Sequence, residues 1–286
     1  IRKSIKLNPN FAGAHFNLGS ILKDLGNLKE AEVSLYKSIE LNPNSAEAHY
    51  NRGIILKDLG RLNEAELSTC KSIELNPEFA EAYYNLGNIL KDLGQVTQSE
   101  VFLRKSIELK PDLAEAHYNL GNILKDLGKL KEAEKSFRKT IEIKPNLAVA
   151  HTNLGNILRD LFELNQAEKS FRKAVELSPN DAETNSNLGR IRLDLDDLQE
   201  AELFFRKAIK LQPNLAEAHI NLSQILLKGK RFEEGWNKYA WRWEGTEAKL
   251  KQLGGKLITS KPEWEPKNNG TVLLWPEQGL GDTVLF

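Results

Sequence analysis

The sequence predicts an all-α solenoid built from repeated helix-turn-helix units, and two observations support this fold class. Seven of the ten prolines recur at a constant interval of 34 residues. Within each interval, apolar residues follow helical spacing twice, on either side of a short break. One amphipathic helix pair cannot bury its apolar face alone, so we expect successive pairs to stack into a continuous core. The recurring prolines are Pro9, Pro43, Pro77, Pro111, Pro145, Pro179 and Pro213.

The fourth unit, residues 114–147, shows the elements in order. Gly128 predicts a turn between two helices, and Pro145 ends the second helix because it lacks an N–H and clashes with the preceding turn. The apolar residues of the first helix are Leu120, Ile123, Leu124 and Leu127. Those of the second helix are Ala133, Phe137, Ile141 and Ile143.

The proline interval also sets the expected domain organisation. Residues 1–11 fit the end of a truncated repeat, and residues 12–249 form seven units. A polar linker with Gly and Pro follows over 250–270, and a short C-terminal α/β stub follows over 271–286, with one strand and one loop. The seven units are 12–45, 46–79, 80–113, 114–147, 148–181, 182–215 and 216–249.

Several positions in each unit carry a resemblance to a known family. In the fourth unit they are Leu120-Gly121, Ala133, Phe137 and Pro145. These residues resemble the tetratricopeptide repeat (TPR) family. The resemblance implies a right-handed TPR superhelical solenoid, in which the first helix of each pair lines the concave face and the second helix lines the convex face.

Glycine is expected in two roles. Gly121 and its equivalents lie inside the first helix, where the absence of a Cβ lets the second helix approach closely. Gly128 and its equivalents form the turn between the helices. Phe162 and Asp196 replace this turn glycine in the fifth and sixth units, so we expect a different bend there.

The composition excludes several classes of function. The 40 Lys and Arg residues balance 40 Asp and Glu residues, which argues against a nucleic-acid partner bound by bulk charge. No run approaches the roughly 18 apolar residues that span a bilayer, so no membrane partner is expected. The single cysteine, Cys70, favours a reducing compartment, and we expect a cytoplasmic protein. The chain contains no methionine, which suggests a fragment.

The repeats carry no arrangement that indicates catalysis. The histidines all occupy the fourth place of a unit, so no two share a helix, and a packing role is expected. Glu and Arg four residues apart on the second helices form pairs that support a helix rather than acid–base chemistry. We therefore expect no catalytic residue, no metal and no cofactor here. The histidines are His15, His49, His117, His151 and His219, and the pairs are Glu100–Arg104, Glu134–Arg138, Glu168–Arg172 and Glu202–Arg206.

An asparagine occupies the sixth place of every unit, on a face of the first helix that core packing does not require. Its amide offers donors and an acceptor that complement a peptide unit, so a column of amides can hold an extended chain. The column resembles the asparagine ladder of O-GlcNAc transferases, which grips extended polypeptide. A scaffold role, with bonds to the adjacent helix, remains the alternative. The asparagines are Asn17, Asn51, Asn85, Asn119, Asn153, Asn187 and Asn221.

Residues beside this column suggest where a ligand binds. Units two to four repeat a tyrosine at place five, a lysine at place twelve and an aspartate at place thirteen, and the last two units lose this surface. We expect a protein or peptide partner in extended conformation, concentrated on units one to four. The alternative is recent duplication, in which these residues are identical between units because the units were copied and not because they bind a ligand. The residues are Tyr50, Tyr84, Tyr118, Lys57, Lys91, Lys125, Asp58, Asp92 and Asp126.

The segment after residue 229 differs in composition. Glu233-Glu234-Gly235-Trp236 and Glu277-Gln278-Gly279-Leu280-Gly281-Asp282-Thr283 resemble bacterial TPR proteins that continue into a glycosyltransferase-like domain. The resemblance implies that a longer parent is a glycosyltransferase and that the repeats present its substrate. Gly279, Gly281 and Asp282 are weak candidates for a cofactor-binding loop. Self-association through the ends of the solenoid is a further possibility.

Overall fold

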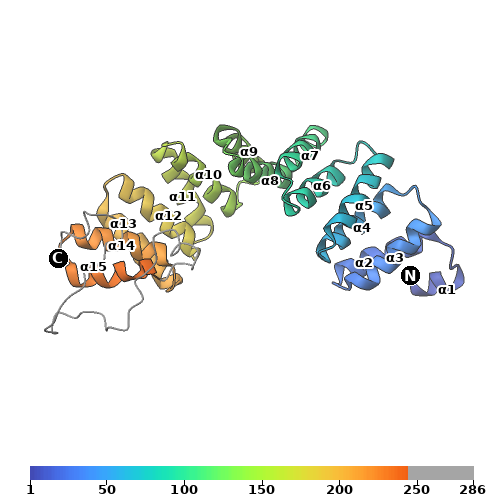
Figure 1. Cartoon of the computed structure of the whole chain (residues 1–286), viewed down its shortest axis with the longest axis horizontal. Helices are drawn as coiled ribbons and strands as arrows, with labels where there is room; N and C mark the ends of the chain where they lie inside the picture. Colours follow the sequence, from blue (N-terminus) through green and yellow to red (C-terminus); the bar gives the residue numbers. More distant parts are fainter. Residues whose placement is uncertain (244–286) are drawn as a thin grey trace, which may run out of the picture. The chain divides into compact units, whose positions relative to one another are not determined.

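A computed structural model describes residues 1–243, and these residues form helices joined by turns. The predicted all-α helix-turn-helix fold is therefore confirmed. The described residues divide into two compact units, residues 1–177 and residues 178–243. Figure 1 labels the helices of both. Several predicted features lie outside the described residues: the end of the seventh repeat, the linker over 250–270, and the α/β segment over 271–286 with Gly279, Gly281 and Asp282.

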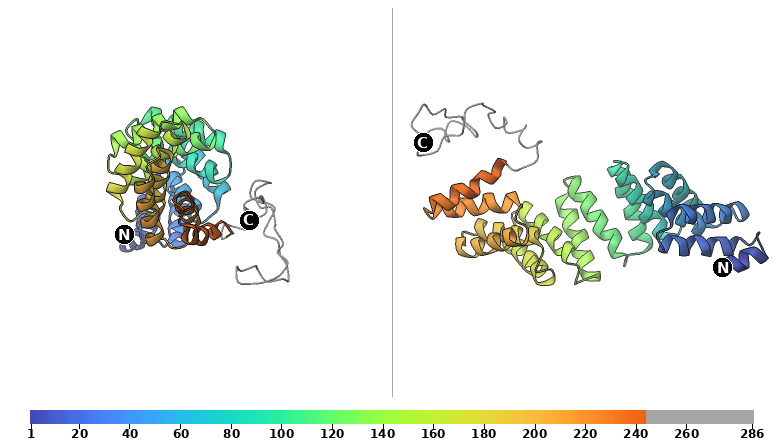
Figure 2. Two further views of the ribbon diagram at one scale, coloured as in Figure 1. Left: turned by 90° about the vertical axis from the view of Figure 1, so that its left-hand side faces the viewer. Right: turned by 90° about the horizontal axis from the view of Figure 1, so that it is seen from below.

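The first unit contains one short helix followed by five helix pairs. Successive pairs lie side by side along the chain, as Figures 1 and 2 show. The helices are α1 (Arg2–Leu7), α2 (Ala12–Asp24), α3 (Leu28–Leu41), α4 (Ala46–Asp58), α5 (Leu62–Leu75), α6 (Ala80–Asp92), α7 (Val96–Leu109), α8 (Ala114–Asp126), α9 (Leu130–Ile143), α10 (Ala148–Asp160) and α11 (Leu164–Leu177).

The second unit contains two further helix pairs within its described residues. A 3₁₀ helix follows the last pair and places Trp241 over His219, with the two rings nearly parallel and their centroids 4.1 Å apart. The elements are α12 (Ala182–Asp194), α13 (Leu198–Leu211), α14 (Ala216–Lys228), α15 (Phe232–Tyr239) and the 3₁₀ helix η1 (Ala240–Trp243).

The first helices of neighbouring pairs lie on the inner side of the stack. In the first unit α2 touches α4, α4 touches α6 and α6 touches α8, whereas the second helices make no comparable contacts with one another. Helices on the shorter, inner path must lie closer together than helices on the outer path. This difference agrees with first helices on the concave face.

The two helices of a pair approach closely where a glycine of the first helix meets a bulky residue of the second, 16 residues later. A Cβ on Gly121 would lie 2.8 Å from Cε1 of Phe137, which is closer than real Cβ contacts. Phe137 is fully buried against this glycine. The expected packing role of the glycine is therefore confirmed, and this close packing offsets the roughly 0.5–1 kcal/mol that glycine costs inside a helix.

The turn between paired helices does not change where glycine is replaced. Gly128 has φ 72°, and Phe162 and Asp196 have φ 61° at the equivalent position. The flanking helices α10 and α11 keep the lengths of α8 and α9. The expectation of a different bend at these two turns is wrong, because the non-glycine residues accept the left-handed conformation rather than deform the turn.

Each histidine, near the start of a helix pair, forms a hydrogen bond with the carbonyl oxygen of the proline six residues before it. The Nε2 atom of His117 lies 2.9 Å from the Pro111 carbonyl oxygen, and His151 makes the same bond to Pro145 at 2.8 Å. The carbonyl only accepts, so Nε2 donates. In the sixth repeat Asn185 replaces histidine, and its Nδ2 donates to the Pro179 oxygen at 3.2 Å. The equivalent bonds are made by His15, His49 and His219.

The predicted Glu–Arg pairs all form, and some arginines also reach the next repeat. Arg104 lies 2.9 Å from Glu100 on its own helix and 2.6 Å from Glu132 on α9. Burial disfavours the charge of Glu100, but bonds from Lys129 and Arg104 hold the pKa of its carboxyl below the ordinary value. The other pairs span 2.9 Å in Glu134–Arg138, 2.7 Å in Glu168–Arg172 and 2.8 Å in Glu202–Arg206.

Replacing Phe162 by glycine is expected to stabilise the protein. The side chain is 89% exposed and its backbone is left-handed, so the substitution relieves strain and loses little packing. We expect a gain of about 0.5–1 kcal/mol in the free energy of unfolding, measured by urea denaturation. The matched variant Gly128→Ala should lose stability. A Phe162→Gly protein that is less stable than the wild type would contradict this account of the turn.

Stability is expected to fall as the pH is lowered through the histidine range. Burial lowers the pKa of His49 and of His219, and the bond to the preceding proline carbonyl offsets this only in part. Their contribution is therefore complete above the ordinary histidine pKa of 6.5 and is lost as the pH falls toward the lower folded value.

This pH dependence can be measured as the urea midpoint between about pH 7.5 and about pH 5.5. The double variant His49→Asn and His219→Asn keeps an amide donor, as Asn185 does, but cannot titrate. We expect a shallower decline of the midpoint in this variant. An identical decline in both proteins would show that these histidines do not carry the effect.

Candidate functional site

The asparagine column follows the inner helices, but its members differ in exposure. Asn17 is exposed and Asn85 is buried, at 7% exposure. The other five side chains are half-buried and can be reached from solvent: Asn51, Asn119, Asn153, Asn187 and Asn221.

Two members of the column use both amide hydrogens to hold the preceding repeat. The Nδ2 atom of Asn119 donates to the Tyr84 hydroxyl at 3.2 Å and to Asn88 Oδ1 at 2.7 Å. Neither bond uses the Oδ1 atom of Asn119, which accepts no hydrogen bond from any described residue. The amide is therefore fixed by its nitrogen and open at its oxygen.

The next repeat shows the same arrangement, 34 residues further along. The Nδ2 atom of Asn153 donates to the Tyr118 hydroxyl at 3.1 Å and to Asn122 Oδ1 at 3.1 Å. Its Oδ1 atom likewise has no hydrogen-bond donor within residues 1–243. Two successive amides thus present oxygen atoms in equivalent positions on α8 and α10.

The acceptor at place nine of the preceding repeat decides where each amide points. Asn88 and Asn122 occupy this place before Asn119 and Asn153, and Ser20 occupies it before Asn51, which donates to the Ser20 hydroxyl at 3.5 Å. Ile54 occupies it before Asn85 and offers no acceptor.

Asn85 turns inward instead of joining the column. Its Nδ2 atom donates to Thr69 Oγ1 at 3.2 Å, in the position where other repeats carry a bulky core residue such as Phe137. Thr69 in turn donates to the Ala65 carbonyl at 2.8 Å. The buried amide is satisfied, so the structure does not bring Asn85 together with Asn119 and Asn153 at the open surface.

The compact unit that begins at residue 178 lacks a tyrosine that could accept a hydrogen bond from a column asparagine. Place five holds Ser186 and Ile220, and place nine before Asn221 holds Arg190, which has only donors. The Nδ2 atom of Asn221 is buried with no hydrogen-bond partner in the described residues. The complete tyrosine–asparagine arrangement is therefore a feature of the first unit.

Charged residues flank the column on the inner helices. Lys57 Nζ lies 3.4 Å from Asp92 Oδ2 of the next repeat. Lys91, Lys125 and Asp126 are exposed and form no ion pair within the described part of the chain, and Asp58 is also exposed. The inner surface therefore presents free charges of both signs beside the amide oxygens.

The tyrosines are held by aromatic neighbours. The Tyr50 ring lies 4.8 Å from the Phe79 ring, and the Tyr118 ring lies 5.9 Å from the Phe137 ring, measured between centroids. Burial raises the pKa of the Tyr50 hydroxyl, so it stays neutral in the physiological range. This packing positions the hydroxyl groups of the inner face.

Sequence reasoning named the asparagine column but missed the partners that orient it. Asn88 and Asn122 act together with the tyrosines as acceptors. Both lie 31 residues before a column asparagine, so an amide recurring at that separation is the signal that could have found them. The amide nitrogens of Asn119 and Asn153 therefore bond to the adjacent helix, as the alternative scaffold role requires.

A double-mutant cycle is expected to detect the bond between neighbouring repeats. Tyr118→Phe and Asn153→Ala should show a coupling of about 1 kcal/mol in the free energy of unfolding, because each single change removes the same hydrogen bond. Tyr50→Phe and Asn85→Ala form the control, since Asn85 donates to Thr69 instead. Coupling of equal size in both cycles would contradict the assigned bond.

Helices long and apolar enough to cross a membrane do not occur in residues 1–243.

No curated protein sequence matches the chain. Among solved structures, YrrB, described as a TPR protein with an unusual peptide-binding site, is 24% identical with a TM-score of 0.60, over 69% of this chain and 97% of its own. MamA is 27% identical with a TM-score of 0.54, over 60% of this chain and 94% of its own. A chain of an APC/C hetero-tetramer is 18% identical with a TM-score of 0.61, over 79% of this chain and 44% of its own.

Family models match the sequence along most of its length. Models described as tetratricopeptide repeat match residues 1–33, 46–79, 71–100, 114–147 and 146–214. A model described as TPR repeat matches residues 19–60 and 87–128. Together these matches run without a gap from residue 1 to residue 214, and the matches over 46–79 and 114–147 each cover one helix pair. The chain belongs to the tetratricopeptide repeat family.

Proposed function

We propose that this protein is an interaction scaffold that holds an extended polypeptide segment against the inner faces of α4, α8 and α10. A TPR solenoid is a protein-interaction scaffold by its fold, and YrrB offers a precedent for peptide binding within it. The extended conformation of the partner and the role of the asparagines are the proposed parts.

The observation that supports this proposal is that two column amides are held through their nitrogen atoms while their oxygen atoms accept no hydrogen bond from any described residue. Asn119 and Asn153 are anchored through Nδ2, and their Oδ1 atoms remain available. An anchored acceptor loses little side-chain entropy when it binds, which favours it over a free surface amide. These amide oxygens are acceptors, so they suit the main-chain N–H groups of an extended segment.

Neighbouring residues add contacts of mixed charge. Lys91 and Lys125 supply cations, and Asp58 and Asp126 supply carboxylates beside the column. Each hydrogen bond contributes only about 0.5–1.5 kcal/mol, and ordering the peptide opposes that gain. We therefore expect micromolar binding that depends weakly on the partner's sequence.

A second candidate function is the substrate-recognition arm of a TPR-containing glycosyltransferase. It rests on the resemblance of residues 233–236, 241–242, 262–264 and 277–283, and the last two of these segments lie outside the described residues. Both functions use the same inner surface to hold a polypeptide. Sugar-nucleotide turnover by a longer parent protein would support this second candidate, and its absence with all common sugar nucleotides would count against it.

Peptide binding is expected to depend on the anchored amides. A library of unstructured peptides is screened against the protein, and the tightest member is titrated by fluorescence anisotropy. The double variant Asn119→Ala and Asn153→Ala should weaken this affinity about tenfold, because two acceptors worth about 0.7 kcal/mol each are lost.

The control separates binding from stability. The double variant Tyr84→Phe and Tyr118→Phe removes bonds between repeats but keeps both amide oxygens. It should lower the urea midpoint and weaken peptide affinity less than the alanine variant does, because Asn88 and Asn122 still hold both amides. Unchanged affinity in the alanine variant, or an equal loss in both variants, would overturn the proposed role of the amides.

A further inference from the structure

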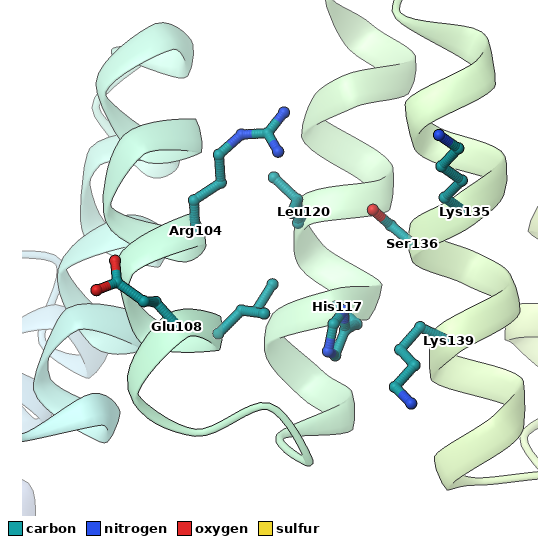
Figure 3. A pocket seen from close by; sticks show the side chains of 8 residues that line it. Arg104, Glu108, His117, Leu120, Lys135, Ser136 and Lys139 are labelled. Carbon is teal, nitrogen blue, oxygen red and sulfur yellow. The ribbon is translucent and has the colours of Figure 1, made fainter.

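Two hollows of matching composition lie on the outer side of the first unit. The first has a volume of about 420 Å³ and lies between α7 and α9, above α8. Figure 3 shows Arg104 and Glu108 on one wall, Lys135 and Lys139 on the other, and Leu120 between them. The second has a volume of about 390 Å³ and lies one repeat further along, between α9 and α11.

The floor of each hollow is apolar and its walls are mainly cationic. Ile107 and Leu120 contribute apolar surface to the first hollow, and Ile141 and Leu154 do so in the second. The walls of the second hollow carry Arg138, Lys169 and Lys173 against one carboxylate, Glu142. The same residue types recur at a separation of 34 residues.

Most of these cations already have partners, but one lysine in each hollow does not. Arg104 is held by Glu100 and Glu132, and Lys139 lies 2.6 Å from Glu142. Lys135 and Lys169 are exposed and form no ion pair with any described residue. Each hollow thus combines an apolar floor with one unpaired ammonium group at its rim.

Among the first six repeats, lysine at the place of Lys135 and Lys169 occurs only in the fourth and fifth. The equivalent position on the second helices holds Val33, Leu67 and Val101 in the first three repeats, and these side chains are 61–72% exposed. The cationic character is therefore not a uniform property of the outer surface.

The chemistry of the hollows favours an acidic and apolar protein segment. An aliphatic side chain fits the floor, and a neighbouring carboxylate pairs with the free ammonium group. A continuous phosphate backbone fits less well, because Glu108 and Glu142 stand in the walls and the chain as a whole has no net charge.

We propose that these two outer hollows form a second binding surface, which takes a protein segment with alternating apolar and acidic residues. Successive apolar–acidic pairs occupy successive hollows, in register with the repeats. The walls of this surface come from second helices, and its floor uses Leu120 and Leu154 of α8 and α10, so it shares no lining residue with the asparagine column on the same first helices.

The test uses a fluorescent peptide in which serine-spaced leucine–glutamate pairs repeat along the chain. Fluorescence anisotropy should show saturable binding to the whole protein that weakens with added salt. The double variant Lys135→Glu and Lys169→Glu should lose about tenfold or more in affinity. The control variant Lys3→Glu and Lys6→Glu makes the same change in net charge on α1 and should bind like the wild type.

Several outcomes would overturn this proposal. Equal losses in both variants would show a general charge effect, and an oligothymidine strand that binds as tightly as the peptide would indicate a site for polyanions. A wild-type dimer that dissociates only in the Lys135→Glu and Lys169→Glu variant would assign the hollows to a second copy of the chain. Circular dichroism checks that each variant is folded, and a folded wild type without saturable peptide binding would also refute the assignment.

Discussion

Phe137 packs directly on the Cα atom of Gly121, and this close approach of two helices is the constraint on which the other features depend. In this pair it limits the separation of the two helices, because a Cβ at the glycine position would displace the ring. The glycines of the first three repeats meet Leu35, Thr69 and Leu103 in the same way, and the seventh repeat carries Ser223 at this position. Pairs with the same geometry then stack in register, and equivalent residues fall one repeat apart. The inner amides, the proline-bound histidines and the outer ion pairs all recur because of this register.

The asparagine column is then a structural element and an open surface at the same time. The amide nitrogens of Asn119 and Asn153 hold neighbouring repeats together, whereas their amide oxygens accept no hydrogen bond within the described residues. Asn85 and Asn221 do not bond to the preceding repeat in this way, because place nine of that repeat holds Ile54 or Arg190 and offers no acceptor. A ligand site of this kind gains rigidity from the bonds that stabilise the scaffold.

Much of the fold could be predicted from the sequence, because the proline interval and the glycine–aromatic spacing act locally within each pair. The turn at Phe162 could not, since the cost of a left-handed non-glycine residue is small compared with the packing of the flanking helices. The inner face of the asparagines was predictable from helical periodicity. Their bonds to Tyr84 and Asn88 were not, because periodicity assigns a face but leaves the contacts between repeats undetermined.

The central claim is that the column amides are anchored through nitrogen before any ligand binds. Hydrogen exchange of the side-chain amides, followed by NMR in the free protein, tests it most directly. The account predicts slower exchange at Asn119 and Asn153 than at Asn17, which is exposed and makes no side-chain hydrogen bond within residues 1–243. Equal, solvent-limited exchange at all three side chains would contradict it.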